Sequence, residues 1–148
     1  MSFIPGIYNL GDRVITGAMS GEVITEGNDS GASVEYVGDL EGMLAASLEI
    51  RFIYGSGGTS GKVYIQTSLN QGSTWIDVVC VTFTTSSLDK VVNLSGLTPK
   101  TTAVVVTDGA LGDDTCLGGF LGDRWRSKVT TIGTYAGSTS LSVRLVAR

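Results

Sequence analysis

The chain has 148 residues, of which 42% are hydrophobic and 16% are charged, and its net charge at pH 7 is −4. A chain of this length forms one domain with a real hydrophobic core, and this hydrophobic content excludes a disordered protein. The acidic balance, without a concentrated run of Lys and Arg, argues against a nucleic-acid partner, and no apolar stretch approaches the ~20 residues of a membrane helix.

The charged fraction is also low, since ordinary soluble domains have ~25% charged residues. One interpretation is that a partner protein covers part of the surface. The alternative is a solitary β domain whose surface is rich in Ser and Thr. The 21 glycines are spread between apolar runs, which predicts many tight turns.

Residues 1–12 are expected to form an extended apolar N-terminal arm, because Pro5, Gly6 and Gly11 interrupt any helix. Such an arm must rest either on its own domain or on a neighbouring subunit. Its apolar side chains are the candidate partner-binding residues: Phe3, Ile4, Ile7, Tyr8 and Leu10. Residues 13–148 are expected to form a β-sandwich domain. The N-terminus lacks the basic segment and long apolar core of a signal peptide.

Short strands are predicted in chain order after the arm. Residues 45–54 give the clearest alternation, since Leu48, Ile50, Phe52 and Tyr54 share one face and polar side chains occupy the other. The other predicted strands outside the central hairpin are residues 13–16, 21–25, 33–37, 90–94, 101–107, 123–135 and 140–148. Residues 55–61 and 108–119 are predicted loops.

Residues 62–77 predict a hairpin. The apolar face of its first strand has Val63, Ile65 and Thr67, which alternate with Lys62, Tyr64 and Gln66. Residues 68–73 are rich in Asn, Ser and Gly, which favour a turn. Residues 75–84 continue as a strand that is apolar on both faces, as a central strand of a sandwich would be.

Helical periodicity is nearly absent, and only residues 40–46 could form a single helical turn. About nine short strands with regular turn signals predict an all-β fold. We expect a single antiparallel β-sandwich, either jelly-roll or immunoglobulin-like.

Catalytic chemistry has little support in the sequence. The chain has no histidine, the commonest general base near neutral pH, and no G-x-S-x-G segment. Asp108, Asp113 and Asp114 share a loop and Asp77 follows Trp75. We interpret these acids as turn formers, with a carboxylate pair or a Ca²⁺ site as alternatives. No catalytic, cofactor-binding or metal-binding residue is assigned, and we expect no enzyme activity and no cofactor.

The sequence allows two roles for each of two sets of residues, the tryptophans and three cations of one strand. Trp75 and Trp125 lie beside apolar neighbours, which favours packing in the core, with a sugar-binding platform as the alternative. Arg124, Arg126 and Lys128 alternate along one strand and therefore point to one face. A solvated face is expected there, and contact with phosphate or an acidic protein is the alternative.

The two cysteines are expected to be reduced thiols. Cys80 lies inside an apolar strand and Cys116 lies in a Gly-rich loop. Sequence alone does not decide whether the two form a disulfide. A zinc site is not predicted, because there is no histidine and no paired-cysteine spacing.

Residues 68–75, Ser-Leu-Asn-Gln-Gly-Ser-Thr-Trp, resemble the Asp-box hairpin S-x-D-x-G-x-T-W, with Asn70 where that motif usually has Asp. The Asp-box is a structural turn of sialidases, sugar-binding proteins and many unrelated β-proteins. Sialidases repeat it once per propeller blade, whereas this chain has one copy and no internal repeat. The resemblance therefore implies a turn and does not imply sialidase activity.

Residues 63–78 and 120–144 together are similar to small, Gly/Thr-rich, all-β virion proteins of tailed bacteriophages. This resemblance implies a capsid decoration (cement) protein that stabilises the head by bridging shell subunits. The implied partner is the major capsid protein or another virion protein, and a homo-oligomer, plausibly a trimer, is implied as well. The protein would be in the virion, assembled in the bacterial host cytoplasm, with no nucleic-acid or membrane partner.

Two alternatives to a capsid decoration protein stay open. The first is a tail or head–tail connector protein, and the second is a carbohydrate-binding β-sandwich module. If the N-terminal arm is the docking element, deletion of residues 1–11 should leave a folded domain that no longer docks.

Overall fold

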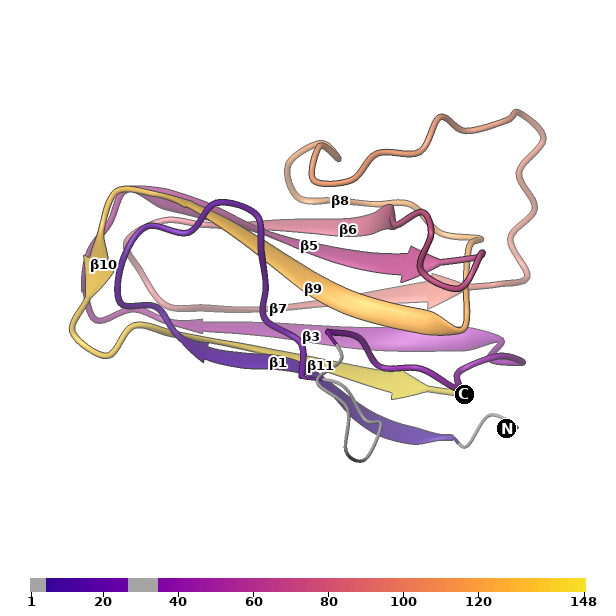
Figure 1. Cartoon of the computed structure of the whole chain (residues 1–148), viewed down its shortest axis with the longest axis horizontal. Coiled ribbons are helices and arrows are strands. Elements are labelled where there is room, and N and C mark those ends of the chain that lie inside the picture. Colours follow the sequence, from indigo (N-terminus) through magenta and orange to yellow (C-terminus); the bar gives the residue numbers. More distant parts are fainter. Residues whose placement is uncertain (1–4, 27–34) are drawn as a thin grey trace.

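Two antiparallel sheets pack face to face in the computed structural model of the chain, which describes residues 5–26 and 35–148 (Figure 1). The first sheet has the strand order β1-β11-β3-β7 and the second has the order β2-β9-β5-β6-β8. The short pair β10-β4 lies at the left end in Figure 1. The predicted all-β antiparallel sandwich is therefore confirmed.

Seven long strands and four two-residue strands make up the described fold. In chain order they are β1 (Gly6–Val14), β2 (Glu22–Val23), β3 (Ala45–Ile53), β4 (Ser56–Gly57), β5 (Ser60–Ser68), β6 (Ile76–Phe83), β7 (Leu88–Ser95), β8 (Thr115–Cys116), β9 (Arg124–Ile132), β10 (Tyr135–Ala136) and β11 (Ser140–Ala147). Within the described ranges, no helix is long and apolar enough to cross a membrane.

The alternating pattern of β3 and β11 builds the inner face of the first sheet. Strand residues two apart share a face, and the inward residues of the two strands lie opposite one another. The opposed inward pairs are Leu48 with Leu145, Ile50 with Val143, and Phe52 with Leu141. All six are at most 1% exposed. Burial of each such side chain contributes roughly 1.5–3 kcal/mol, so these pairs are a main source of sandwich stability.

The central strand pair of the second sheet is buried on both faces, as the sequence predicts for residues 75–84. Val79 and Val81 of β6 face the first sheet, while Asp77 and Cys80 face outward and are nevertheless buried. The outer face is covered by residues 96–114, which we call the long loop; it connects β7 to β8 and projects at the upper right of Figure 1.

Residues 101–107 were expected to form a strand because Thr and Val dominate them, and this prediction is wrong. The segment is part of the long loop and forms no β-ladder with a strand among the described residues. The edge of β6 is occupied at two points: Asp77 N donates to Thr107 O over 2.9 Å, and β8 pairs with Val79 and Cys80. Residues 101–106 therefore have no unoccupied edge of β6 with which to form a ladder.

Three other predicted strands differ from the structure in extent. Residues 13–16 overlap only the end of β1, and residues 21–25 contain only the two-residue β2. In residues 33–37, positions 33 and 34 lie outside the described residues, and Val37 makes a single bridge to Trp125. Residues 40–46 contain a turn and no helix.

The expected N-terminal arm is, in its described part, an edge strand of the sandwich. β1 pairs with β11 from Gly6 to Val14, so the boundary expected between residues 12 and 13 falls inside a strand. A β-bulge between Asn9 and Gly11 interrupts the ladder, and Leu10 at that bulge is fully buried. Gly11 has a φ of 147°, and a Cβ there would lie 2.5 Å from the Ile24 side chain, so only glycine fits.

The five candidate partner-binding residues are therefore in different environments. Phe3 and Ile4 lie outside the described residues. Leu10 belongs to the core, and Tyr8 packs against the core while partly buried. Ile7 remains 73% exposed on the outer face of β1. The structure thus assigns Leu10 to folding and leaves Ile7 on the surface.

The two cysteines are free, in agreement with the expected reduced thiols. Cys80 lies opposite Thr115, and Cys116 lies opposite Val79, one step along the same ladder. Neighbouring positions of a ladder point to opposite faces of the sheet, so the two sulfur atoms are on different sides. Burial raises the pKa of the Cys80 thiol above its ordinary value.

Leu10→Ala should lower the free energy of unfolding by about 2–5 kcal/mol, because it leaves a cavity at the bulge of β1. The matched control is Ile7→Ala in the same strand, which should change the free energy by less than about 0.5 kcal/mol. Urea unfolding followed by tryptophan fluorescence measures both. Equal effects of the two substitutions would show that β1 does not pack as described, and deletion of residues 1–11 should also destabilise the domain.

Candidate functional site

The Asp77 carboxylate fastens the long loop to the second sheet. It is 1% exposed. Its oxygens accept hydrogen bonds from the backbone N–H groups of Gly109, Ala110 and Leu111 at 2.8–3.1 Å and from the Thr107 hydroxyl at 2.8 Å. A buried carboxylate is stable only when donors surround it in this way. Donors of the long loop therefore hold the Asp77 carboxylate of β6 in place.

A second acid extends this network across the outer face. The Gln66 side-chain amide donates to Asp77 at 2.7 Å and to Asp108 at 2.6 Å. Asp108 also pairs with Lys128 at 2.9 Å and with Arg126 at 3.6 Å. Partial burial alone would raise the pKa of Asp108, but the hydrogen bonds from Lys128 and Gln66 outweigh burial and lower it. The carboxylate therefore stays ionised and links the loop to β9.

Two further acids hold the far side of the loop. Asp114 accepts from the backbone N–H and the hydroxyl of Thr82 at 3.0 and 2.6 Å and from Lys90 at 2.9 Å. These bonds outweigh the raising effect of burial and lower the pKa of Asp114 to about 2. Asp113 pairs with Lys62 at 2.6 Å. The Thr82 amide belongs to the edge of β6, so Asp114 also protects that edge from other chains.

The acids of this loop are thus held in structural hydrogen bonds and ion pairs. All four candidates for a carboxylate pair or a Ca²⁺ site, Asp77, Asp108, Asp113 and Asp114, have protein donors at their oxygens. Over residues 5–26 and 35–148, no group of three or more acidic or cysteine side chains could hold a metal ion. This geometry agrees with the interpretation of Asp108, Asp113 and Asp114 as turn formers, whereas Asp77 lies on β6 and holds the loop from the sheet.

Exposed apolar side chains of the anchored long loop lie at one end of the sandwich beside those of Leu44 and Leu69, and we call this group the apolar end. Its members are Leu44, Leu69, Leu97, Val104, Val105 and Val106. Val105 is 90% exposed. Leu69, Val104 and Val106 line a groove of about 240 Å³ together with Ile76 and Phe120. The Gly96 N–H donates to Leu44 O at 2.8 Å, which brings Leu44 beside the start of the loop.

The sequence carried a signal for the apolar end, but the signal was ambiguous. Three consecutive valines at 104–106 have the composition of a buried strand, and periodicity cannot distinguish such a strand from an exposed apolar segment. Only the position of the segment relative to the sheet edge decides between the two.

The turn at residues 68–75 has the internal hydrogen bonds of a self-contained loop. The Ser68 hydroxyl accepts from Gly72 N at 2.8 Å and donates to Asn70 Oδ1 at 3.1 Å. Asn70 Oδ1 also accepts from Thr74 N at 2.8 Å. Gln71 and Gly72 have φ values of 59° and 88°, and glycine is the residue that tolerates such values best. Asn70 therefore supplies the acceptor that the Asp of the similar motif would supply.

A cleft lies beside this turn, between it and the start of β9. Its volume is about 410 Å³, and it is lined by Glu35, Tyr36, Gln71, Gly72, Trp75, Arg124 and Arg126. The guanidinium of Arg124 lies over the Tyr36 ring, with 4.5 Å from carbon to centroid. That of Arg126 lies over the Trp75 ring at 4.2 Å. We call this the arginine–aromatic cleft.

Trp125 and Trp75 have different environments, although both were expected to pack in the core. Trp125 is fully buried and its indole N–H donates to Gly122 O at 2.9 Å, so packing in the core is confirmed for it. Trp75 is only half-buried and lines the cleft, so the same interpretation is wrong for Trp75. The cause is the turn, which ends at Trp75 and places it outside the sandwich.

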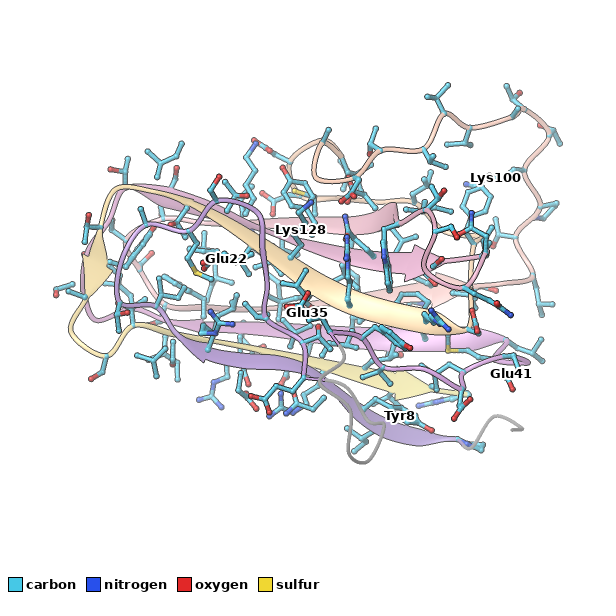
Figure 2. All side chains as sticks on the ribbon, viewed as in Figure 1. Tyr8, Glu22, Glu35, Glu41, Lys100 and Lys128 are labelled. Carbon is cyan, nitrogen blue, oxygen red and sulfur yellow. The ribbon has the colours of Figure 1, made fainter. Side chains whose placement is uncertain are left out.

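The predicted single face for Arg124, Arg126 and Lys128 is confirmed, because all three lie on the outer face of β9 opposite Ser68, Gln66 and Tyr64. The expected solvated face is wrong for Arg126 and Lys128, because their side chains are only 15% and 21% exposed. Figure 2 labels Lys128 and Glu35 near the middle of the molecule, and Lys100 lies away from both, on the long loop.

Comparison of the chain with family models, curated proteins and solved structures finds no match.

Asp77→Ala should lower the free energy of unfolding by about 3 kcal/mol or more, because hydrogen bonds to a charged group contribute about 1.5–3 kcal/mol each and the loop amides lose their acceptor. Hydrogen exchange should accelerate at Gly109, Ala110 and Leu111. The control is Asp113→Ala, which removes a solvent-exposed ion pair with Lys62 and should change the free energy of unfolding little. Unchanged exchange in the Asp77 variant would contradict the anchoring role.

Acid should weaken the Asp114 contact within a defined range. The folded-state pKa of about 2 lies below the ordinary value of 3.8. Stability from this carboxylate is therefore complete above about pH 4 and is lost as pH falls through 2. The melting temperature of the wild type should fall more steeply between pH 4 and pH 2 than that of Asp114→Asn. Parallel curves for the two proteins would contradict the assignment.

Proposed function

We propose that the protein is a structural component of a tailed-phage virion, a capsid decoration protein that docks on the shell through its apolar end. The observation that carries this proposal is the exposure of six large apolar side chains at one end of a single sandwich. Exposed apolar groups gathered in this way mark contact surfaces for other proteins. The similarity of residues 63–78 and 120–144 to small virion proteins supports a shell as the partner.

The energetics of the apolar end suit a stable contact. Burial of an exposed Leu or Val side chain contributes roughly 1.5–3 kcal/mol, and Val105 and Leu97 are 90% and 73% exposed. Asp77 already fixes the end of the loop on the sheet, which reduces the entropy lost when the loop is ordered on binding. The low charge of the chain also suits such a contact, because the cores of interfaces are depleted in charged residues.

Bridging two shell subunits requires a second contact surface. β1 and β7 are the outer strands of the first sheet. Ile7 on β1 and Val91 on β7 are 73% and 72% exposed. We propose that one of these edges contacts a neighbouring shell subunit or another copy of the chain, since unpaired strand edges readily accept a further strand.

Copy number tests the proposed position in the virion. Quantitative mass spectrometry of purified phage particles should find hundreds of copies per particle for a decoration protein. Six or twelve copies would instead favour a tail or head–tail connector ring. Absence of the protein from purified particles would overturn the proposal.

Val105→Asp should abolish docking without affecting the fold, because it places a charge at the most exposed apolar position of the loop. Ile132→Asp is the matched control: Ile132 is 62% exposed and lies opposite Ser60, at the other end of the β5–β9 ladder from Ser68 and therefore away from the apolar end. Co-sedimentation with shells that lack the protein measures docking, and thermal unfolding checks the fold. Equal binding by both variants would rule out the apolar end as the docking surface.

A further inference from the structure

We propose that the arginine–aromatic cleft binds a sugar acid, that is, a sugar ring that carries a single carboxylate. This inference is independent of capsid docking, because the cleft and the apolar end share no lining residue. The cleft volume of about 410 Å³ lies within the ~300–1,000 Å³ of ordinary small-ligand sites.

Arg124 and Arg126 supply the donors for the carboxylate. Arg124 donates a hydrogen bond from Nη1 to Gln71 O in the turn. Arg126 donates from Nε to Gln66 Oε1 at 2.7 Å. A guanidinium has five N–H donors in a fixed fork, so both groups keep donors for a ligand oxygen. Planar, two-point pairing with a carboxylate is the interaction that arginine makes best.

The two guanidinium groups are held in place before any ligand arrives. Arg124 is fixed by the turn on one side and by the Tyr36 ring on the other. Arg126 is fixed by Gln66, by Asp108 and by the Trp75 ring. Such fixation lowers the side-chain entropy that binding would otherwise cost, about 0.5–1.5 kcal/mol per side chain. Gly72 allows this arrangement, because a Cβ there would lie 2.9 Å from Arg124 Nη1.

The walls of the cleft favour a sugar ring over a bare anion. Each guanidinium group covers one face of its ring, and Tyr36 and Trp75 contribute the remaining ring surface to the cleft lining. The two ring centroids are 6.3 Å apart and the planes are tilted by 45°. Aromatic side chains pack against the C–H groups of a sugar through their apolar bodies and keep a polar edge for hydrogen bonds. Gln71 adds a side-chain amide at the rim, which can donate to or accept from a hydroxyl.

The Glu35 carboxylate in the lining limits how much negative charge a ligand of the cleft can carry. The lining has two arginines and one glutamate, and Arg126 also faces Asp108 outside the lining, so the positive charge offered to a ligand is small. Such a cleft matches a single carboxylate better than a doubly charged phosphate. A carboxylate at the wall repels any anion that offers no donor to it. The hydroxyl groups of a sugar acid are such donors, so one ligand satisfies both the arginines and Glu35.

The test uses methyl β-D-glucuronide as the probe and methyl β-D-glucoside as the neutral analogue of the same shape. The chain has two tryptophans, so its two indole N–H signals in NMR spectra report separately. The Trp75 signal should shift saturably with the glucuronide, while that of buried Trp125 stays in place. The glucoside should bind at least tenfold more weakly.

Three variants identify the groups responsible. Arg124→Gln should weaken glucuronide binding at least tenfold, and Arg124→Lys, which keeps the charge and loses the fork, should have an intermediate effect. Lys100→Gln removes the same charge outside the cleft and should change nothing. If Arg124→Gln unfolds, the Lys variant and the neutral analogue still provide the comparison.

Three results would overturn the proposal. The first is the absence of a saturable Trp75 shift with the glucuronide, and the second is an equal affinity for the glucoside. The third is an equal response to acetate, which would make the cleft a site for any carboxylate and not for a sugar acid. With acetate, Glu35→Ala should bind more tightly than the wild type, whereas with the glucuronide it should bind more weakly.

Discussion

The hydrogen bonds of one buried carboxylate determine how the outer half of this protein is built. Asp77 accepts bonds from three successive amides of the long loop and from Thr107, and it lies on a strand of the second sheet. An ionised group in such a position is tolerated only with full hydrogen bonding, so the loop has one favourable place on the sheet. Burial of the outer face of β6 depends on that placement.

The same network connects the two surfaces to which we assign binding. Gln66 donates to Asp77 and Asp108, and it accepts from Arg126. The long loop that exposes the valines at 104–106 is therefore joined through one glutamine to the arginine–aromatic cleft. Polar networks of this kind rigidify a structure when every member has its partners. The rigidity suits both a docking surface and a cleft with fixed guanidinium groups.

Local pattern predicts those parts of the fold where one face of a strand meets the core. The alternation in residues 45–54 placed Leu48, Ile50 and Phe52 correctly, because a period of two leaves only one way to bury the apolar set. The hairpin was also predictable, since Ser68, Asn70 and Gly72 form the turn by bonding one another. By contrast, residues 101–107 have a strand composition but no available edge, and sequence does not show which edges are occupied.

The sequence by itself determined an all-β antiparallel sandwich, the faces of its long strands, the turn before Trp75 and the common face of three cations. Each of these follows from side chains that are neighbours along the chain or two positions apart. The tertiary structure decided that Gly6–Val14 is an edge strand, that Leu10 lies in the core and that Trp75 lies outside it. It also decided that Arg124 and Arg126 meet aromatic rings from distant segments. Those outcomes depend on contacts between residues far apart in sequence, which no local pattern encodes.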